Sequence, residues 1–206
     1  MARPRSDIPE RLRRAASTRF LREGVDGASL RAIAGDARTS IGMLYYYYPT
    51  KDDLFFAVVE DVYQKISGEL VEALAPERSV EDRVERTYRR IAAFSEQELV
   101  VLRLVACEIL KGTERLELLL ERFQRGHVAL MGRLVADGIG DGTFDRRRHP
   151  LVVFMALMGL GGLPQIIRRL AADRLPFPDA PAGDALSHEL VQVLLHGVAP
   201  RPAARE

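Results

Sequence analysis

The chain of 206 residues has a single cysteine, no tryptophan and no hydrophobic run long enough to cross a membrane. One cysteine excludes an intrachain disulfide framework and fits a reducing cytosol. The opening MARPRSD lacks the apolar core of a secretory signal, and the longest apolar run, residues 151–164, falls short of the roughly 20 residues that a span needs. We therefore expect a soluble, cytoplasmic protein that does not interact with membranes.

Motifs for catalysis and for metal binding are also missing. The sequence contains no HExxH, CxxC, GxSxG, phosphate-loop or dinucleotide-binding glycine pattern. Cys107 lies among Leu104, Val105 and Leu110, which favours a buried, inert thiol over a reactive one. None of the four histidines has a partner at metal-ligand spacing. We predict a protein that is not an enzyme and that needs neither a metal nor a cofactor.

Composition allows one substantial core, or one small and one medium domain, since hydrophobic residues make up 47% of the chain and charged residues 29%. The charges are unevenly distributed. Residues 1–51 hold ten Lys or Arg against five Asp or Glu, and the remaining residues hold twenty against twenty-four. A basic N-terminal segment is typical of a DNA-facing head, although a solvated charged face accounts for it almost as well.

Residues 29–51 show the pattern of two short helices joined by a tight turn. Apolar residues recur at helical spacing over residues 29–37, with Ser29 placed to cap the first turn. A second short helix is predicted over residues 40–47, and Pro49 ends it. Three tyrosines remain for its outer and flanking faces, which is unusual for a surface that contacts only solvent. The pattern indicates a DNA-reading unit.

The flanking segments complete this unit. An apolar stripe predicts a helix over residues 8–23, and Gly24 suits its C-terminal cap. Thr50 and Asp53 form a capping-box pattern that starts the next helix. Lys51 then lies in a first turn, where its charge opposes the helix dipole. A bound phosphate explains such a lysine, because the free N–H groups and the ammonium bind the same anion.

This segment resembles the N-terminal domain of the TetR family of bacterial transcriptional regulators, specifically over residues 8–56. The matching residues are Ala15, Ala16, Phe20, Gly24, Ser29, Leu30, Ile33, Ala34, Ala37, Ser40, Gly42, Leu44, Tyr45, Lys51 and Leu54. The turn departs from the family pattern, because Arg38 and Thr39 stand where Gly and Val are usual, and Met43 stands where Thr is usual. Arg38 can contact a phosphate or a guanine edge and Met43 a thymine methyl, so we interpret the departures as changes of site preference.

The resemblance implies a homodimer that presents two recognition helices to successive major grooves, about 34 to 36 Å apart, of a near-palindromic double-stranded DNA operator. Ser29, Tyr45 and Lys51 are expected to position phosphates. The predicted DNA-binding residues are Ser29, Arg38, Thr39, Ser40, Gly42, Met43, Tyr45, Tyr46, Tyr47 and Lys51. We predict a DNA-binding head over residues 1–49 and an effector-binding and dimerisation body over residues 50–206.

The rest of the chain keeps a helical periodicity. Further helices are predicted over residues 50–74, 80–96, 98–110, 114–137, 150–172 and 184–196. Gly138, Gly140 and Gly142 are expected to break the chain, and Asp184 is expected to cap the last helix. With the three N-terminal helices this makes about nine helices and no convincing strand. The predicted fold class is all-α.

Two sets of residues carry the functions that the resemblance implies for the body. The candidates for an effector pocket are Tyr88, Phe94, Arg103, Cys107, Phe123, His127 and Met131. Each of them also fits an ordinary core position. The residues expected to pair the last two helices with their copies are Phe154, Met158, Leu190, Val191 and Leu194. On pattern alone the core of a monomer explains the same helices equally well.

The resulting hypothesis is a ligand-responsive transcriptional regulator, in the family's usual mode a repressor that a small, largely apolar effector releases from its operator. The long helix over residues 50–74 would carry the change between body and head. One alternative is a small-molecule-binding or catalytic helical protein that keeps the head only as a scaffold. A second is an architectural DNA binder without an effector. Both alternatives predict no palindrome.

Overall fold

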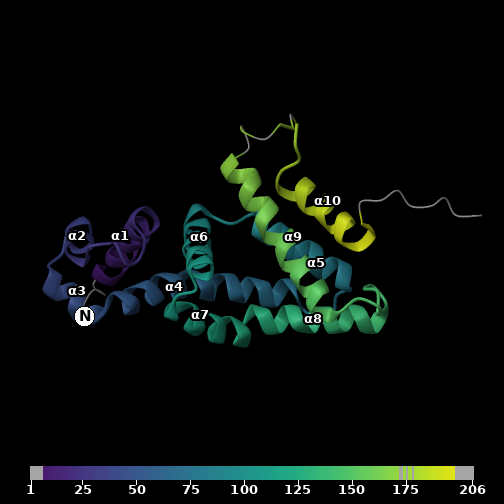
Figure 1. Ribbon diagram of the computed structural model, residues 1–206, viewed down its shortest axis with the longest axis horizontal. Coiled ribbons are helices and arrows are strands. Elements are labelled where there is room, and N and C mark those ends of the chain that lie inside the picture. Colours follow the sequence, from purple (N-terminus) through teal and green to yellow (C-terminus); the bar gives the residue numbers. More distant parts are fainter. Residues whose placement is uncertain (1–6, 172–173, 175, 178, 198–206) are drawn as a thin grey trace, which may run out of the picture. The chain divides into compact units, whose positions relative to one another are not determined.

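The described part of the chain consists of ten α-helices and contains no strand, which confirms the predicted all-α class (Figure 1). The computed structural model describes residues 7–171, 174, 176–177 and 179–197. The helices are α1 (Ile8–Glu23), α2 (Leu30–Asp36), α3 (Ile41–Tyr47), α4 (Lys51–Ala73), α5 (Val80–Ala92), α6 (Glu96–Lys111), α7 (Glu114–Arg125), α8 (His127–Asp141), α9 (Pro150–Ala171) and α10 (Gly183–His196).

The three N-terminal helices form the small bundle that the sequence predicts. Helix α1 packs on α2 and on α6, and α2 packs on α3. Leu12, Ala16 and Phe20 face the interior and are at most 1% exposed. The ring of Phe20 meets the ring of Phe55 on α4 at a centroid distance of 6.2 Å. This apolar seam holds α1 against the first turns of α4.

The helices fall into two compact units. The first unit comprises the described residues up to Ile66 together with Ser95–Arg122, and the second comprises Ser67–Phe94 with the described residues from Phe123 onward. Helix α4 is continuous, as predicted, and contributes residues to both units. Helix α6 belongs to the same unit as the head, which the sequence did not indicate. The functional boundary after residue 49 stays a prediction.

The second unit is built around an apolar core, in which α5, α9 and α10 pack on one another and α8 packs on α5 and α9. Tyr88 is 1% exposed, and its hydroxyl donates a hydrogen bond of 2.9 Å to the Leu157 carbonyl. Gly161 allows α9 to approach the tyrosine, since a Cβ there would lie 2.5 Å from a ring carbon. The core residues are Leu74, Val80, Val84, Tyr88, Met131, Leu134, Val135, Phe144, Val153, Leu157 and Val191.

The helix expected over residues 114–137 is in fact two helices. Gly126 leaves the helical conformation, with φ −111° and ψ −121°, and separates α7 from α8. Helix α8 then continues through Gly138 and Gly140, so the break expected at these two glycines was wrong. The ring of Phe144 packs where a side chain on Gly138 would stand, which explains a glycine inside the helix. Gly142, with φ 87°, ends α8, and the described residues form ten helices instead of about nine.

Two helix starts also differ from expectation. Helix α6 begins at Glu96 because Ser95 and Glu98 form a capping box, in which the Glu98 carboxylate accepts the Ser95 N–H at 2.6 Å and the Ser95 hydroxyl accepts the Glu98 N–H at 3.3 Å. Helix α10 begins at Gly183, and Asp184 lies in its first turn instead of capping it. The carboxylate still interacts favourably with the helix dipole from that position.

Helix α9 is long and apolar enough to cross a membrane by length and composition alone. Its 22 residues continue past the apolar run 151–164, with a mean hydropathy of 1.8 over its most apolar window and 22% of that window buried. Core helices of soluble proteins have the same composition, and α9 packs on α5, α8 and α10.

Candidate nucleic-acid interface and effector site

The turn between α2 and α3 is closed by a Schellman motif. Arg38 adopts a left-handed conformation, with φ 52°, and donates its N–H to the Gly35 carbonyl at 2.9 Å. The N–H of Thr39 donates to the Ala34 carbonyl at 3.0 Å, which completes the motif. The left-handed conformation suits glycine, because a Cβ comes close to the following carbonyl oxygen. The arginine therefore occupies a position that a glycine would fill without strain.

Both short helices of the motif start at a serine. The Ser29 hydroxyl accepts a hydrogen bond of 3.4 Å from the Ala32 N–H, and the Ser40 hydroxyl accepts one of 3.2 Å from the Met43 N–H. Each helix has only seven residues, so it depends on its cap and on tertiary packing. Ser29 and Ser40 are exposed, and each hydroxyl can still donate its own hydrogen to a phosphate.

Helix α3 buries one side and exposes the other. Leu44 is fully buried, whereas Tyr45 and Tyr46 are 51% and 76% exposed. Gly42 is also exposed and lies one turn before the two tyrosines, so a base edge can approach the helix backbone beside them. Of the other predicted contacts, Arg38 is exposed, and the half-buried ones are Thr39, Met43, Tyr47 and Lys51.

An unpredicted brace holds the C-terminal end of α3. Tyr48 is 9% exposed, and its hydroxyl accepts a hydrogen bond of 3.2 Å from Arg13 on α1. The same guanidinium forms an ion pair of 3.2 Å with Asp61 on α4. Because these residues are far apart in the sequence, no local pattern could have indicated the brace. These contacts tie the C-terminal end of α3 to α1 and α4.

The start of α4 has the predicted capping box. Asp53 accepts the Thr50 N–H at 3.0 Å and donates its own N–H to the Thr50 hydroxyl at 3.0 Å. The ammonium of Lys51 donates a hydrogen bond of 2.7 Å to the carbonyl of Asp26, in the loop between α1 and α2. An ammonium has three donors, so two remain for a phosphate.

The predicted effector residues are divided between the two units. Arg103 and Cys107 lie on α6 in the first unit, and both are exposed. The expectation of a buried thiol was therefore wrong. Leu104 and Val105 are buried, whereas Cys107 and Leu110 are exposed, and the Leu110 side chain is 87% exposed.

Four of the five remaining candidates, all except His127, are buried in the second unit. Tyr88 and Met131 are core residues, and burial raises the pKa of the Tyr88 hydroxyl above its usual value. Phe94 is 7% exposed and lies under the guanidinium of Arg90, whose carbon is 5.0 Å from the ring centroid.

Phe123 and His127 lie close together on either side of the break at Gly126. Their ring centroids are 5.0 Å apart. Burial lowers the pKa of the His127 imidazole, so the ring is neutral at pH 7. A neutral imidazole can both donate and accept a hydrogen bond, which suits a polar contact in an apolar site. Among the described residues no group of His, Cys, Asp or Glu is arranged to hold a metal ion.

A groove of about 550 Å³ lies on α9 in the second unit, and its lining is almost wholly apolar. The lining residues are Ala156, Gly159, Leu160, Leu163, Pro164, Ile167, Arg168, Ala180, Pro181 and Leu186. None of the predicted effector residues lines this groove. Periodicity alone did not indicate it, because Ala180, Pro181 and Leu186 close the groove from outside α9.

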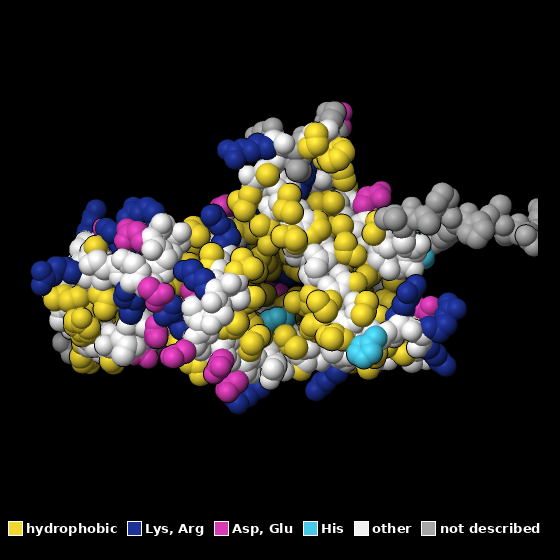
Figure 2. Space-filling view, in the orientation of Figure 1, with side chains coloured by type: hydrophobic (Ala, Val, Ile, Leu, Met, Phe, Trp, Pro, Cys, Tyr) yellow, Lys and Arg dark blue, Asp and Glu magenta, His cyan; other side chains and the backbone are white. Residues whose placement is uncertain are grey.

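The predicted dimer contacts differ in exposure. Met158 is 39% exposed, whereas Val191 is 1% exposed and belongs to the core of its own unit. Phe154, Leu190 and Leu194 are partly buried against that core. The most exposed apolar side chains of α9 are Leu151, Val152, Met155, Leu163 and Leu170. Figure 2 shows hydrophobic side chains gathered over this helix.

The capped two-helix motif, with its exposed glycine and tyrosines, defines a helix-turn-helix protein of the DNA-binding class with a helical body. Residues 12–58 match the model of the family described as bacterial regulatory proteins, tetR family. The chain thus carries a TetR-family head, as its sequence predicts. That family consists of regulators, which are generally not enzymes.

Solved structures of TetR-like regulators share the fold over more than nine-tenths of the chain. A Clostridium perfringens protein provisionally described as a fatty acid metabolism regulator has a TM-score of 0.79 and 15% identity, over 93% of this chain and 100% of that one. FadR from Bacillus subtilis, in complex with stearoyl-CoA, has a TM-score of 0.70 and 15% identity, over 92% and 99%. AibR, in complex with isovaleryl coenzyme A and operator DNA, has a TM-score of 0.69 and 15% identity, over 91% and 98%. No curated protein sequence matches the chain.

Proposed function

We propose that this protein is a cytoplasmic transcriptional repressor that binds a near-palindromic operator as a homodimer and leaves it when a small effector binds. The observation that carries the proposal is the face of α3, where Gly42, Tyr45 and Tyr46 are exposed together. Ser29, Tyr45 and Lys51 position phosphates in this proposal. The residues that read base edges are Arg38, Thr39, Gly42, Met43 and either Tyr46 or Tyr47. No catalytic step is assigned to the chain.

Dimerisation through α9 and α10 is supported by the exposed apolar side chains of α9. Leu151, Met155 and Leu163 are 57%, 63% and 59% exposed. A contiguous apolar patch of this kind marks an interaction surface. Met155→Glu should yield a monomer in size-exclusion chromatography with light scattering, and it should bind a half-site more weakly than the wild type binds the full operator. A wild-type monomer at micromolar concentration would contradict the dimer.

The effector class best supported for a first test is an acyl thioester of coenzyme A. FadR and AibR share the fold and were solved with stearoyl-CoA and isovaleryl coenzyme A. We expect one of these thioesters to release the protein from its operator, whereas free coenzyme A should not. If neither thioester releases the protein from its operator, acyl thioesters of coenzyme A are excluded as effectors, and the other parts of the proposal are unaffected.

The experiment that tests DNA reading is selection of bound sequences from a random duplex library at near-physiological salt. Wild type is compared with Tyr46→Ala, which removes a side chain 76% exposed on α3, and with Phe177→Ala, which removes one 68% exposed outside the head. We expect a near-palindrome with the wild type and with Phe177→Ala, and its loss or change with Tyr46→Ala. Salt-sensitive binding without any enriched sequence would favour the architectural alternative.

A further inference from the structure

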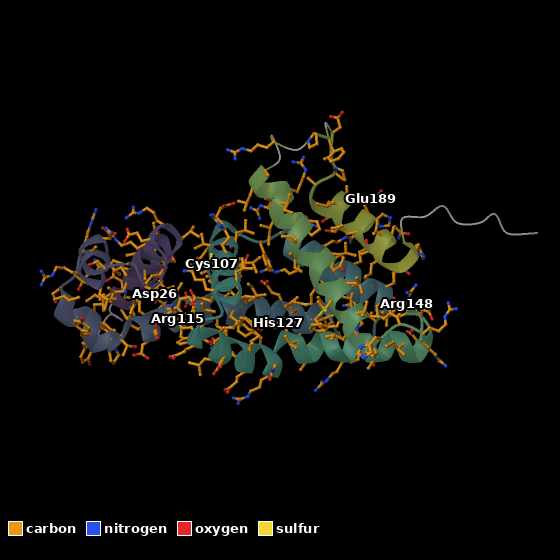
Figure 3. All side chains as sticks on the ribbon, viewed as in Figure 1. Asp26, Cys107, Arg115, His127, Arg148 and Glu189 are labelled. Carbon is orange, nitrogen blue, oxygen red and sulfur yellow. The ribbon has the colours of Figure 1, made fainter. Side chains whose placement is uncertain are left out.

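One guanidinium in the first unit joins three carboxylates from three separate elements. Arg115, at the start of α7, donates to Glu108 on α6 at 2.9 Å, to Asp52 on α4 at 3.0 Å and to Asp26 at 2.9 and 3.0 Å. The guanidinium carbon also lies 5.8 Å from the centroid of the Phe55 ring. Figure 3 shows Asp26 and Arg115 next to each other. The forked shape of arginine is what permits three simultaneous partners.

The three pairs differ in how easily they can break. The side chain of Glu108 is 1% exposed and that of Arg115 is 11% exposed, and the Thr113 hydroxyl also donates to Glu108 at 2.6 Å. Separating this pair would leave a buried carboxylate without its counter-charge. Asp26 and Asp52 are 68% and 52% exposed, so water can replace the arginine there. Glu108 thus keeps Arg115 on the turn between α6 and α7, while the other two links can open.

The two links that can open both lead to the helix-turn-helix motif. Asp26 lies in the loop that enters α2, and its carbonyl also accepts the hydrogen bond from Lys51. Asp52 lies in the first turn of α4, a few residues after the recognition helix ends at Tyr47. The two carboxylates therefore flank the motif at its beginning and at its end. A movement of Arg115 acts on both sides of the motif at once.

We propose that Arg115 is a positioning residue that couples the turn between α6 and α7 to the orientation of the DNA-binding head. A ligand that displaces α6 or α7 separates Arg115 from Asp26 and Asp52 and so weakens operator binding. This inference rests on the proposed function, since it concerns how operator binding is regulated. Coupling is reciprocal, so operator binding must in turn stabilise the turn that carries Arg115.

Reciprocity allows a test that needs no effector. The N–H of Gly112 donates to the Glu108 carbonyl and that of Leu116 to the Thr113 carbonyl, so amide exchange over residues 112–118 reports opening of the turn. Exchange is measured by mass spectrometry on the full chain, free and saturated with the duplex enriched from the random library. We compare the wild type with the double variant Asp26→Asn, Asp52→Asn, which keeps both side-chain shapes. The matched control is Asp36→Asn, which breaks the pair with Arg19 inside the head.

We expect the operator to slow exchange over residues 112–118 by about fivefold or more in the wild type and in Asp36→Asn, the lower end of typical coupling. In the double variant the operator should bind more weakly, yet at saturation it should still protect α3. Exchange over residues 112–118 should then change by less than about twofold, because the charged pairs with Arg115 are lost. Equal protection in the double variant and the wild type overturns the proposal, and so does absence of protection in the wild type. If no duplex is enriched at all, the proposed function itself fails and the coupling falls with it.

Discussion

The DNA-binding head and the second unit both have an apolar core, but they differ in how many polar contacts supplement it. In the head, two helices of seven residues depend on serine caps and on polar pairs between helices, such as Arg19 to Asp36 at 2.6 and 3.1 Å. In the second unit, longer helices share an apolar core in which Gln165 and Ser187 form a buried polar pair at 3.1 Å. Short helices cannot bury a long apolar stripe, so directional contacts set their positions. Caps and polar pairs therefore add to burial in fixing the reading surface, whereas the second unit depends mainly on burial.

Removal of core volume from the second unit should cause the largest loss of stability. Leu134 is fully buried in its core, and Leu134→Ala should lower the free energy of unfolding by about 4 kcal/mol, because it leaves a cavity as well as losing apolar burial. Leu110→Ala, at a position 87% exposed, is the matched control and should change stability little. Thermal melts followed by circular dichroism measure both. Equal losses would contradict the assigned core.

The next largest effect is expected at Arg115. Arg115→Ala leaves Glu108 buried with only the Thr113 hydroxyl as a partner, and should cost about 3 kcal/mol, the lower end of the range for a broken buried pair. Arg115→Lys keeps one charge but cannot fork to three carboxylates, so its loss should be smaller. Urea unfolding gives both values. If the lysine variant were as unstable as the alanine variant, the directed hydrogen bonds of the guanidinium, and not its positive charge, would determine the stability.

The same contrast explains what could be predicted from the sequence. Helix ends in the head were predicted closely because their signals are local: Ser29 and Ser40 are caps, Thr50 and Asp53 form a capping box, and Gly24 has φ 74°. Each signal acts through hydrogen bonds or backbone angles within a few residues, so a single sequence contains it. Helix type and order in the body followed from periodicity in the same way.

Helical periodicity could not predict which side of a helix packs on which neighbouring helix. Cys107 and Leu104 are three residues apart, yet one is exposed and the other buried. Val191 was expected to face a partner subunit and lies in the core. The carboxylates around Arg115 come from positions 26, 52 and 108, and only folding brings them together. Contacts between distant segments are outside the reach of a local pattern.

Loss of a single cap should have a moderate effect that is confined to the head. Ser40→Ala removes the hydrogen bond to the Met43 N–H and should cost about 1 kcal/mol of stability. Because α3 has seven residues, operator affinity should fall along with it. Ser40→Asp is the control, since aspartate caps equally well but places a negative charge beside the DNA. If the aspartate variant regains stability but binds the operator poorly, the cap at Ser40 and its contact with phosphate are separate roles.

A smaller, pH-dependent effect is expected in the second unit. Burial holds the pKa of His127 below its ordinary 6.5, so on acidification the unfolded chain takes up the proton first and the folded state loses stability below about pH 6.5. Above that pH both states are neutral and the contribution vanishes. His127→Gln should therefore lose less Tm than the wild type between pH 7.5 and pH 5.5. The exposed His196 gives the control, and His196→Gln should behave like the wild type.

The smallest expected change in stability concerns Arg38, where the two principles of the comparison oppose each other. Arg38→Gly removes the cost of a left-handed arginine, about 1 kcal/mol, and part of this gain is offset because glycine loses more freedom on folding. A net stabilisation of about 0.5 kcal/mol should raise the Tm slightly. Operator affinity should fall instead, since a cation beside the DNA is lost, and the slope of log K against log salt should flatten by about one if Arg38 contacts a phosphate.

Arg38→Ala separates these two effects. Alanine keeps a Cβ in the left-handed conformation, so it should show the same loss of affinity and the same change of slope without the gain in Tm. If Arg38 instead contacts a guanine edge, both variants should change the selected sequence at one position and leave the others intact. An unchanged sequence with unchanged affinity would mean that Arg38 only terminates α2. In that case the strained turn would have no role in reading DNA, and the exposed face of α3 would read it alone.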